Sequence, residues 1–293
     1  MIYTDNYYRW KRVEEVKQTP TGILAELHGE QLSIDVVRAD LLRIKISRGG
    51  VFDESPTFAV CVDPLATPAH FRVEQDGERV QLITSACTAS LWLDPLRIDV
   101  HRSDGSPVIE TAQDSDGQYW AYATLNDSFT IRRRCRQEDA IFGLGEKGGR
   151  HNRRGRDFTL WNTDVLSPSE TLEFTAGKAP DDPRGDFRSV EFDPYYVSIP
   201  FFYHQSYPGG SMAASFMDNG YRGEYEFSHN EEYRIIFRGG QYTEYVFACP
   251  DMPAILEAYT WLTGRTALPP IWSLGYHQCR WFEYTQDTVE DVA

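Results

Sequence analysis

The sequence predicts a mainly β protein, built as a large antiparallel β-sandwich with a differently patterned segment after it. Apolar and polar residues alternate with period two through most of residues 1–250, which is typical of strands with one buried face. Asp-Gly dipeptides, which favour tight hairpin turns, separate several of these runs. After Cys249 the apolar spacing changes to that of a helix. We therefore expect residues 1–250 to form one sandwich with no more than one or two helices.

Individual strands are predicted from the alternating runs. Residues 31–47 alternate on both sides of a turn at Asp40, and residues 78–105 continue in the same way up to an Asp-Gly turn. Further strands are expected in the segments SFTIRRRCR, SMAASFMDNGYRGEYEF and EYRIIFRGGQYTEYVFA. Many short strands separated by turns are typical of an antiparallel sandwich.

The first convincing helix is predicted at residues 251–264, where it would link the sandwich to residues 265–293. Asp251 stands in the N-cap position, Pro253 falls in the first turn, and Gly264 marks the end. The apolar face of this helix would consist of Ile255, Leu256, Tyr259 and Leu262.

Residues 265–293 predict one strand and then the beginning of a second helix. The stretch from Trp272 to Trp281 has the pattern of a strand, and Asp287 and Glu290 have the spacing of a capping box. A strand followed by a helix is the repeating unit of a parallel sheet or barrel, and a single unit has no neighbour with which to pair. We therefore expect the chain to end inside its second domain.

Composition and charge exclude several classes of function. The net charge of −15 argues against nucleic acid as a partner, because a phosphate backbone selects basic surfaces. No apolar run approaches the length of a membrane span. The five cysteines are far apart and the N-terminus lacks the apolar region of a signal peptide, so free thiols and a cytoplasmic location are expected. The histidines show no metal-ligand spacing, no cofactor is expected, and the oligomeric state is left open.

Two short motifs invite a nucleotide or phosphate interpretation that their surroundings do not favour. GLGEKG (143–148) matches a dinucleotide fingerprint, but the segment after it is too polar and too rich in glycine to begin the helix that holds a pyrophosphate. A turn-rich loop with positive φ is the alternative. The second motif is a basic cluster of Arg150, Arg153, Arg154 and Arg156. In an acidic chain, such a cluster is most often a solvated loop or a partner for carboxylates.

Two other segments are open to a functional interpretation. In LWNTD (160–164), the Asn and Asp side chains fit a turn in which they bond the backbone. The carboxylate also fits a rim where it would accept hydrogen bonds from sugar hydroxyls. Near the carboxyl end of the predicted strand, His277, Gln278 and Arg280 interrupt an apolar run. In a barrel that end faces the active site, and a buried polar network with a structural role is the alternative.

Five segments carry a resemblance to a known family. They are FGLGEK (142–147), WNTD (161–164), YVSIPFF (196–202), LTGRTALPPIWSLG (262–275) and YHQCRW (276–281). Their order resembles that of glycoside hydrolase family 31, the α-glucosidase and α-xylosidase family. The match covers the second half of the chain, whereas the first half is similar only in its richness in strands. The resemblance implies an N-terminal β-sandwich followed by the truncated start of a catalytic (β/α)8 barrel.

The resemblance also implies part of a sugar pocket, with carbohydrate as the ligand. The aspartate of the family's W-N-x-D motif matches Asp164, on a loop that reaches from the sandwich over the barrel mouth. The first barrel strand would supply the pocket wall, with Trp281 as the first candidate, Phe282 as an alternative and Arg280 beside them. The two catalytic aspartates of this retaining family lie on later barrel strands, so no catalytic residue is assigned before residue 293. A long insertion between Asp164 and Tyr196 departs from the family pattern.

Two functions are consistent with these observations. The first is the N-terminal portion of a retaining α-glucosidase-like glycoside hydrolase acting on α-linked glucosides or related sugars. Such a chain alone would be inactive, since hydrolysis needs both an acid and a nucleophile. The second is a stand-alone carbohydrate-binding or structural β-sandwich without catalysis. A reading frame that continued past Ala293 into strand–helix repeats would favour the first.

Overall fold

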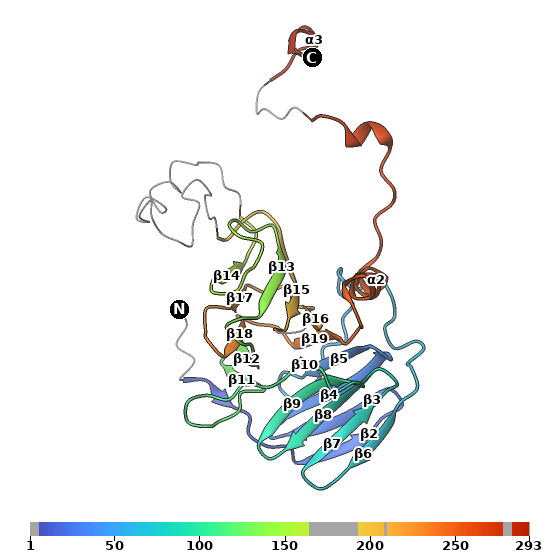
Figure 1. Cartoon of the computed structure of the whole chain (residues 1–293), viewed down its shortest axis with the longest axis vertical. Coiled ribbons are helices and arrows are strands. Elements are labelled where there is room, and N and C mark those ends of the chain that lie inside the picture. Colours follow the sequence, from blue (N-terminus) through green and yellow to red (C-terminus); the bar gives the residue numbers. More distant parts are fainter. Residues whose placement is uncertain (1–5, 164–192, 208–209, 278–282, 293) are drawn as a thin grey trace.

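Three antiparallel sheets make up the body of the computed structural model, which describes residues 6–163, 193–207, 210–277 and 283–292 (Figure 1). The eight-stranded sheet has the order β13 (Ala140–Gly145), β15 (Ser198–Gln205), β16 (Met212–Met217), β19 (Tyr242–Phe247), β5 (Leu41–Ile46), β4 (Glu30–Arg38), β3 (Gly22–Leu27), β2 (Glu15–Gln18). The six-stranded sheet has the order β1 (Tyr8–Arg9), β11 (Ala123–Leu125), β12 (Ser128–Arg134), β18 (Glu232–Phe237), β17 (Gly223–Glu226), β14 (Asp157–Leu160). The five-stranded sheet has the order β10 (Pro107–Ile109), β9 (Leu96–Arg102), β8 (Cys87–Leu93), β7 (Arg79–Ile83), β6 (Arg72–Gln75).

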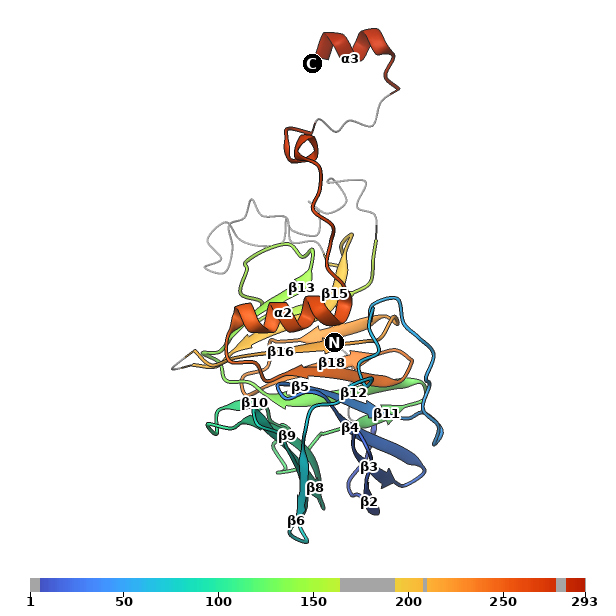
Figure 2. The same cartoon turned by 90° about the vertical axis from the view of Figure 1, so that its right-hand side faces the viewer.

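The predicted period-two pattern matches the burial of several of these strands. Along β9, buried residues alternate strictly with partly exposed ones, and β7 follows the same rule. Strand β19 is buried at every position. It lies near the middle of the eight-stranded sheet, which is covered on one face by the other sheets and on the opposite face by a helix (Figure 2). Within the described residues that precede Asp251, no α-helix occurs, as the sequence predicts.

The hydrophobic core has two parts on opposite faces of the eight-stranded sheet. The larger part lies between the sheets and is rich in aromatic side chains, including Phe129, Phe202, Tyr225, Phe227 and Tyr233. The smaller part lies beneath helix α2 (Met252–Thr263), where Ile255, Ala258 and Leu262 pack against Phe201, Phe216 and Phe247. Apolar burial on both faces stabilises the eight-stranded sheet, which has β13 and β15 at one edge.

Helix α2 occupies the predicted linking segment. The Ala254 N–H donates to Asp251 Oδ1 at 2.8 Å, which is the N-cap bond that the sequence indicates. Gly264 ends the helix with a positive φ of 89°. One detail of the predicted apolar face is wrong. Leu256 is half exposed, and Ala258 takes its place in the core, because the face that meets the sheet is narrower than the apolar stripe.

The strand predicted from Trp272 to Trp281 is wrong for the residues that the structure describes. Ile271–Leu274 form a short 3-10 helix, η2, and residues 275–277 belong to no strand; residues 278–281 lie outside the described residues. The segment leads away from the sheets (Figure 2), so no described strand lies beside it to accept backbone hydrogen bonds. The backbone bonds locally instead, from Ser273 N to Pro270 O at 3.0 Å.

The last helix, α3 (Gln286–Val292), begins earlier than the predicted capping box. Its first turn is capped by Thr285, whose Oγ1 accepts from Thr288 N at 3.2 Å. Asp287 lies in the first turn of the helix, where its negative charge interacts favourably with the positive end of the helix dipole. The predicted start of a barrel after residue 264, and the predicted domain boundaries at residues 250 and 264, stay predictions.

A buried ion pair joins the two largest sheets through the core. Arg133 of β12 and Glu244 of β19 have no exposed side-chain surface, and Arg133 Nη2 lies 3.3 Å from Glu244 Oε2. Ser215 Oγ donates to the other Glu244 oxygen at 2.6 Å, and the Tyr242 hydroxyl donates to Oε2. Burial alone would lower the pKa of Arg133, but the nearby Tyr242 and Glu244 more than offset this effect. The pKa is raised overall, so the guanidinium stays charged. The two charges therefore fix how β12 and β19 face each other.

We predict that Arg133→Met lowers the free energy of unfolding by about 3–5 kcal/mol, because Glu244 is left as an unpaired buried charge. Urea unfolding at pH 7 measures the change. Arg72→Met is the matched control because Arg72 pairs with Glu74 at the surface, and it should cost less than about 1 kcal/mol. Adding Glu244→Met to Arg133→Met should recover part of the loss. A loss below about 1 kcal/mol in the single variant would contradict the prediction.

Candidate functional site

Three of the five family segments meet at one corner of the sandwich. Residues 142–147 end β13, residues 161–163 follow β14, and residues 196–202 lead into β15. Gly145 pairs with Ser198 across the two edge strands, and Glu146 N donates to Val197 O at 2.9 Å. Figure 1 shows β13, β14 and β15 together at this corner. Segments separated by up to about fifty residues in the sequence therefore build one local structure.

The glycines of residues 143–148 serve close backbone packing. Gly143 and Gly145 have φ values of 126° and 78°. A Cβ on Gly143 would lie 2.6 Å from Phe201 O, and one on Gly145 would lie 2.7 Å from Val197 O, so β15 can approach only a glycine. No helix begins in the described residues 149–163. The positive φ predicted for this segment is confirmed, and no helix of a dinucleotide fingerprint follows it. The predicted turn-rich loop is wrong for Gly143 and Gly145, which belong to strand β13.

Lys147 fastens the chain on both sides of residues 164–192. Its side chain is fully buried, and Nζ donates to Thr159 O at 2.6 Å and lies 3.6 Å from Asp193 Oδ1. The second Asp193 oxygen accepts from Thr159 N at 2.7 Å. Burial lowers the pKa of Lys147, and the Asp193 carboxylate opposes that shift. The ammonium thus ties β14 to the segment that returns toward β15, and we call this arrangement the Lys147 clamp.

Asn162 and Thr163 extend this connection to the end of the described segment. Asn162 Oδ1 accepts from Ser198 N at 2.9 Å, and Thr163 N donates to Tyr195 O at 3.0 Å. The Asn162 side chain therefore bonds the backbone, as predicted, but the bond joins it to a residue 36 positions away. Residues 161–163 form no turn, so the local turn predicted at Asn162 is wrong. The Asp164 part of that interpretation lies outside the described residues.

A cavity of about 340 Å³ adjoins the clamp. Trp161, Asn162, Ser198, Pro200 and Tyr221 are among its lining residues. The Trp161 and Tyr221 side chains are 51% and 59% exposed, respectively. Aromatic faces beside hydroxyl and amide groups are what recognition of a polyol needs, because apolar sugar faces stack on rings while the hydroxyls form hydrogen bonds.

All four predicted sugar-site residues lie outside the described residues. They are Asp164, Arg280, Trp281 and Phe282. Thr163, which directly precedes Asp164, is part of the connected corner. Leu268, Ile271, Trp272, Leu274 and Tyr276, which come before the other three, are 70–94% exposed. The predicted proximity of Asp164 and Trp281 therefore stays a prediction.

Two arginines of the basic cluster, Arg153 and Arg154, are neither solvated nor paired with carboxylates among the described residues. They bond backbone carbonyls instead. Arg153 is buried and donates to the carbonyls of Gly143, Lys147, Gly148 and Arg150. Arg154 donates to the carbonyls of Cys135, Arg136, Phe227 and Asn230. The expectation was wrong because one guanidinium offers five donors in a fixed plane, so it can satisfy a curved loop that turns several carbonyls inward.

A buried Asp–His pair that no sequence motif indicates lies at the far end of β15. His204 Nε2 lies 2.8 Å from Asp139 Oδ2, and Asp139 also accepts from the N–H groups of Arg136 and Tyr207. Although burial raises it, these hydrogen bonds lower the pKa of Asp139 to about 2. The two residues are 65 positions apart, so no local spacing could have indicated the pair.

This pair and Cys135 form the one group among the described residues whose donor atoms are close enough for a metal ion, all within 4.8 Å of one another. Both Asp139 oxygens already accept hydrogen bonds. Burial raises the pKa of the Cys135 thiol to about 12, which disfavours the thiolate that a metal requires. The Arg154 guanidinium lies beside the Cys135 carbonyl. Hydrogen bonding explains the group without a metal. The four described cysteines are free thiols.

The family model for the glycosyl hydrolase 31 N-terminal galactose mutarotase-like domain matches residues 31–180. This chain belongs to glycoside hydrolase family 31. Alpha-glucosidase 2 of Bacillus thermoamyloliquefaciens is 32% identical over 263 residues, which are 89% of this chain and 30% of that protein. Alpha-xylosidase 1 of Arabidopsis thaliana is 42% identical over 159 residues, which are 53% of this chain and 15% of that protein. The family 31 chain thus spans less than a third of the length of these two relatives.

Solved structures of the family share the fold. The Flavobacterium johnsoniae dextranase of family 31, complexed with glucose, has a TM-score of 0.80 at 22% identity. It is matched over 97% of this chain and 32% of the dextranase chain. An α-xylosidase of the family from a soil metagenome, complexed with xylose, has a TM-score of 0.71 at 16% identity over 95% of this chain and 39% of its own. Among the described residues, no helix has the length and apolar character needed to cross a membrane.

We predict that Lys147→Met loosens the corner while the sandwich stays folded. The Thr159 carbonyl and the Asp193 carboxylate lose their buried cation, and a hydrogen bond to a charged group is worth about 1.5–3 kcal/mol. Amide hydrogen exchange at Thr159 and Thr163 should become faster, with the circular dichroism of the sheets unchanged. Lys11→Met, at an exposed position, is the control. Unaltered exchange at both amides would contradict the clamp.

We predict that Asp139→Asn lowers the free energy of unfolding by about 2 kcal/mol at pH 7, because charge-assisted hydrogen bonds are lost. The pKa of Asp139 is about 2 in the folded state, below its ordinary value of 3.8. The stability that it contributes is therefore present above pH 4 and is lost as the pH falls through about 2. The free energies of unfolding of the wild type and Asp139→Asn, measured with urea from pH 7 to pH 2, should converge as the pH falls. Asp116→Asn, at an exposed turn, should differ little at any pH. A constant difference for Asp139→Asn would refute the assignment.

Proposed function

We propose that this chain is the N-terminal portion of a retaining α-glucosidase-like glycoside hydrolase that acts on α-linked glucosides or related sugars. The observation that carries the proposal is the convergence of three family segments on one corner, where Lys147, Asn162 and Ser198 hold the chain just before Asp164. The similarity to alpha-glucosidase 2 over 89% of the chain supports the same substrate class.

In this proposal the chain supplies sugar-binding groups and no catalytic acid or nucleophile. Asp164 accepts hydrogen bonds from sugar hydroxyls on a loop whose base is the Lys147 clamp. Arg280, Trp281 and Phe282 form part of the opposite wall. Retaining hydrolysis uses two carboxyl groups about 5 Å apart, one as nucleophile and one as acid and then base. We assign both to aspartates of a (β/α)8 barrel that come after residue 293 in the natural protein.

Exposed apolar side chains support a large partner domain at this end of the sandwich. Trp161, Tyr196, Val197 and Ile199 are 38–51% exposed beside the clamp. The segment from Leu268 to Tyr276 exposes five further large apolar side chains. An exposed apolar surface of this kind usually marks an interaction site. A catalytic barrel that covers both surfaces would also bring residues 280–282 toward the clamp.

We predict that Asp164→Ala, in the natural protein that contains this chain, lowers kcat/KM for an aryl α-glucoside by about 10- to 100-fold. The reason is the loss of hydrogen bonds from sugar hydroxyls to a charged carboxylate, worth about 1.5–3 kcal/mol. An aryl α-xyloside, assayed in parallel, reports which sugar is preferred. Residues 1–293 alone should give no turnover above a matched blank.

The control is Asp127→Ala, which removes an exposed carboxylate from a turn of the sandwich and should leave the kinetics unchanged. Wild-type kinetics for Asp164→Ala would overturn the assigned role. A natural protein that binds glucosides but never hydrolyses them would favour the alternative, a carbohydrate-binding β-sandwich without catalysis.

A further inference from the structure

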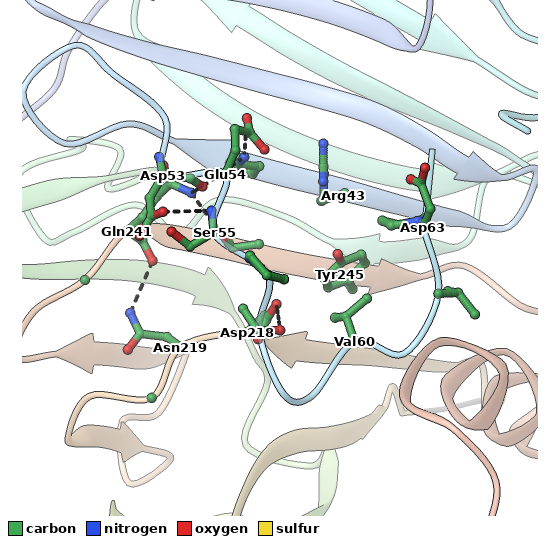
Figure 3. Close-up of a pocket in the computed structure, with 18 of the residues that line it drawn as sticks. Arg43, Asp53, Glu54, Ser55, Val60, Asp63, Asp218, Asn219, Gln241 and Tyr245 are labelled. Carbon is green, nitrogen blue, oxygen red and sulfur yellow. Dashed lines mark hydrogen bonds and ion pairs between the residues drawn. The ribbon is translucent and has the colours of Figure 1, made fainter. Parts of the chain in front are cut away.

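A cavity of about 490 Å³ lies on the outer face of the eight-stranded sheet (Figure 3). Its floor is formed by β5 and β19, which contribute Arg43 and Tyr245. A crossing segment, residues 53–64, lies over the floor, and residues 218–221 close one end. None of the five family segments contributes a lining residue. The volume is within the range of small-molecule sites in proteins, about 300–1,000 Å³.

The crossing segment is fixed at several points, so the cavity is formed before any ligand binds. Asp53 N donates to Gln241 Oε1 at 2.9 Å, and Gln241 Nε2 donates back to Asp53 O at 3.3 Å. Thr57 Oγ1 donates to Asp218 Oδ2 at 3.0 Å. Farther along, Cys61 N donates to Leu262 O of helix α2 at 2.9 Å. Because these hydrogen bonds already hold the crossing segment in place, less conformational entropy is lost when a ligand binds.

The charges in the cavity exclude an anionic ligand. Arg43 Nη2 pairs with Asp35 at 3.1 Å, and Lys45 Nζ pairs with Glu54 at 2.8 Å. Three more carboxylates line the cavity, those of Asp53, Asp63 and Asp218. Because the cations are already neutralised, a phosphate or carboxylate would face net negative charge. A neutral ligand with many hydroxyl groups has no such penalty and can donate to the carboxylates.

Asp218 is the acceptor best placed for such a ligand. It is half-buried, lines the cavity, and accepts one side-chain bond, from Thr57 to Oδ2. Burial raises its pKa, while Thr57 and Arg43 oppose that shift.

Tyr221 provides an aromatic surface at the rim. Its ring is held against the backbone of Gly239, where an added Cβ would lie 2.6 Å from the ring, and its side chain is 59% exposed. Tyr221 also lines the cavity beside Trp161. The two cavities therefore share the lining residues 219–221.

We propose that the cavity under residues 53–64 binds one sugar unit of an α-glucan oligosaccharide, as a second carbohydrate site outside the catalytic pocket. Asp218 accepts hydrogen bonds from the sugar hydroxyls, and Tyr221 contacts an apolar sugar face. The choice of α-glucan rests on the proposed function, whereas the polyol class rests on the charges and hydrogen-bonding groups of the cavity itself.

The test is a calorimetric titration of the natural protein that contains this chain with isomaltotriose and with maltotriose. Asp218→Asn should weaken binding of at least one trisaccharide by about tenfold or more, since a charged acceptor is lost. Val60→Phe fills the cavity without changing Asp218 and should have the same effect. Asp104→Asn, at an exposed turn, should bind as the wild type does. Thermal melting of each variant confirms folding.

The kinetics separate this proposal from the proposed function. Both cavity variants should keep the wild-type kcat/KM for an aryl α-glucoside, which lacks the further sugar unit assigned to the cavity, and should have a lower kcat/KM for the trisaccharide. Unchanged trisaccharide affinity in both variants, with hydrolysis intact, overturns the cavity site alone. Binding that depends on Asp218 in a protein without hydrolase activity would keep the site and overturn the proposed function.

Discussion

The buried ammonium of Lys147 is the interaction on which the functional corner depends. A lysine side chain without exposed surface is stable only when its charge is compensated, and here the partners are Thr159 O and Asp193. These partners lie on the two sides of residues 164–192. The requirement to satisfy one charge therefore sets where that segment leaves the sandwich and where it returns, whatever the length of the segment between.

Other buried cations hold the fold in the same way. Arg133 connects two sheets through Glu244, and Arg153 donates to four carbonyls, one in β13 and three in the loop that follows it. In each case apolar packing decides that the elements come together, while a polar contact decides their relative position. The sheets supply a rigid body, and the buried cations fix the loops that carry the family segments on its edge.

The sequence predicts features that depend on local geometry. The alternation along β9, the N-cap at Asp251 and the end of helix α2 at Gly264 all arise from residues that are close in the chain. Features that depend on distant partners were missed or wrong. The strand expected after Trp272 needed a neighbouring strand, and the pairing of Asp139 with His204 joins residues 65 positions apart. The candidate site could be predicted only in part, because its segments could be found in the sequence but the role of Lys147 could not.

A crystal structure of the natural protein with isomaltotriose bound would test the central claim most directly, because it locates a sugar relative to the Lys147 clamp. We predict a glucose unit beside Trp161, with the Asp164 carboxylate within about 3.2 Å of a sugar hydroxyl. The hydrogen bond between Asn162 and Ser198 and both Lys147 contacts should be unchanged. A bound sugar in the catalytic pocket that makes no contact with Asp164, or a corner in which the Lys147 contacts are broken, would contradict the account.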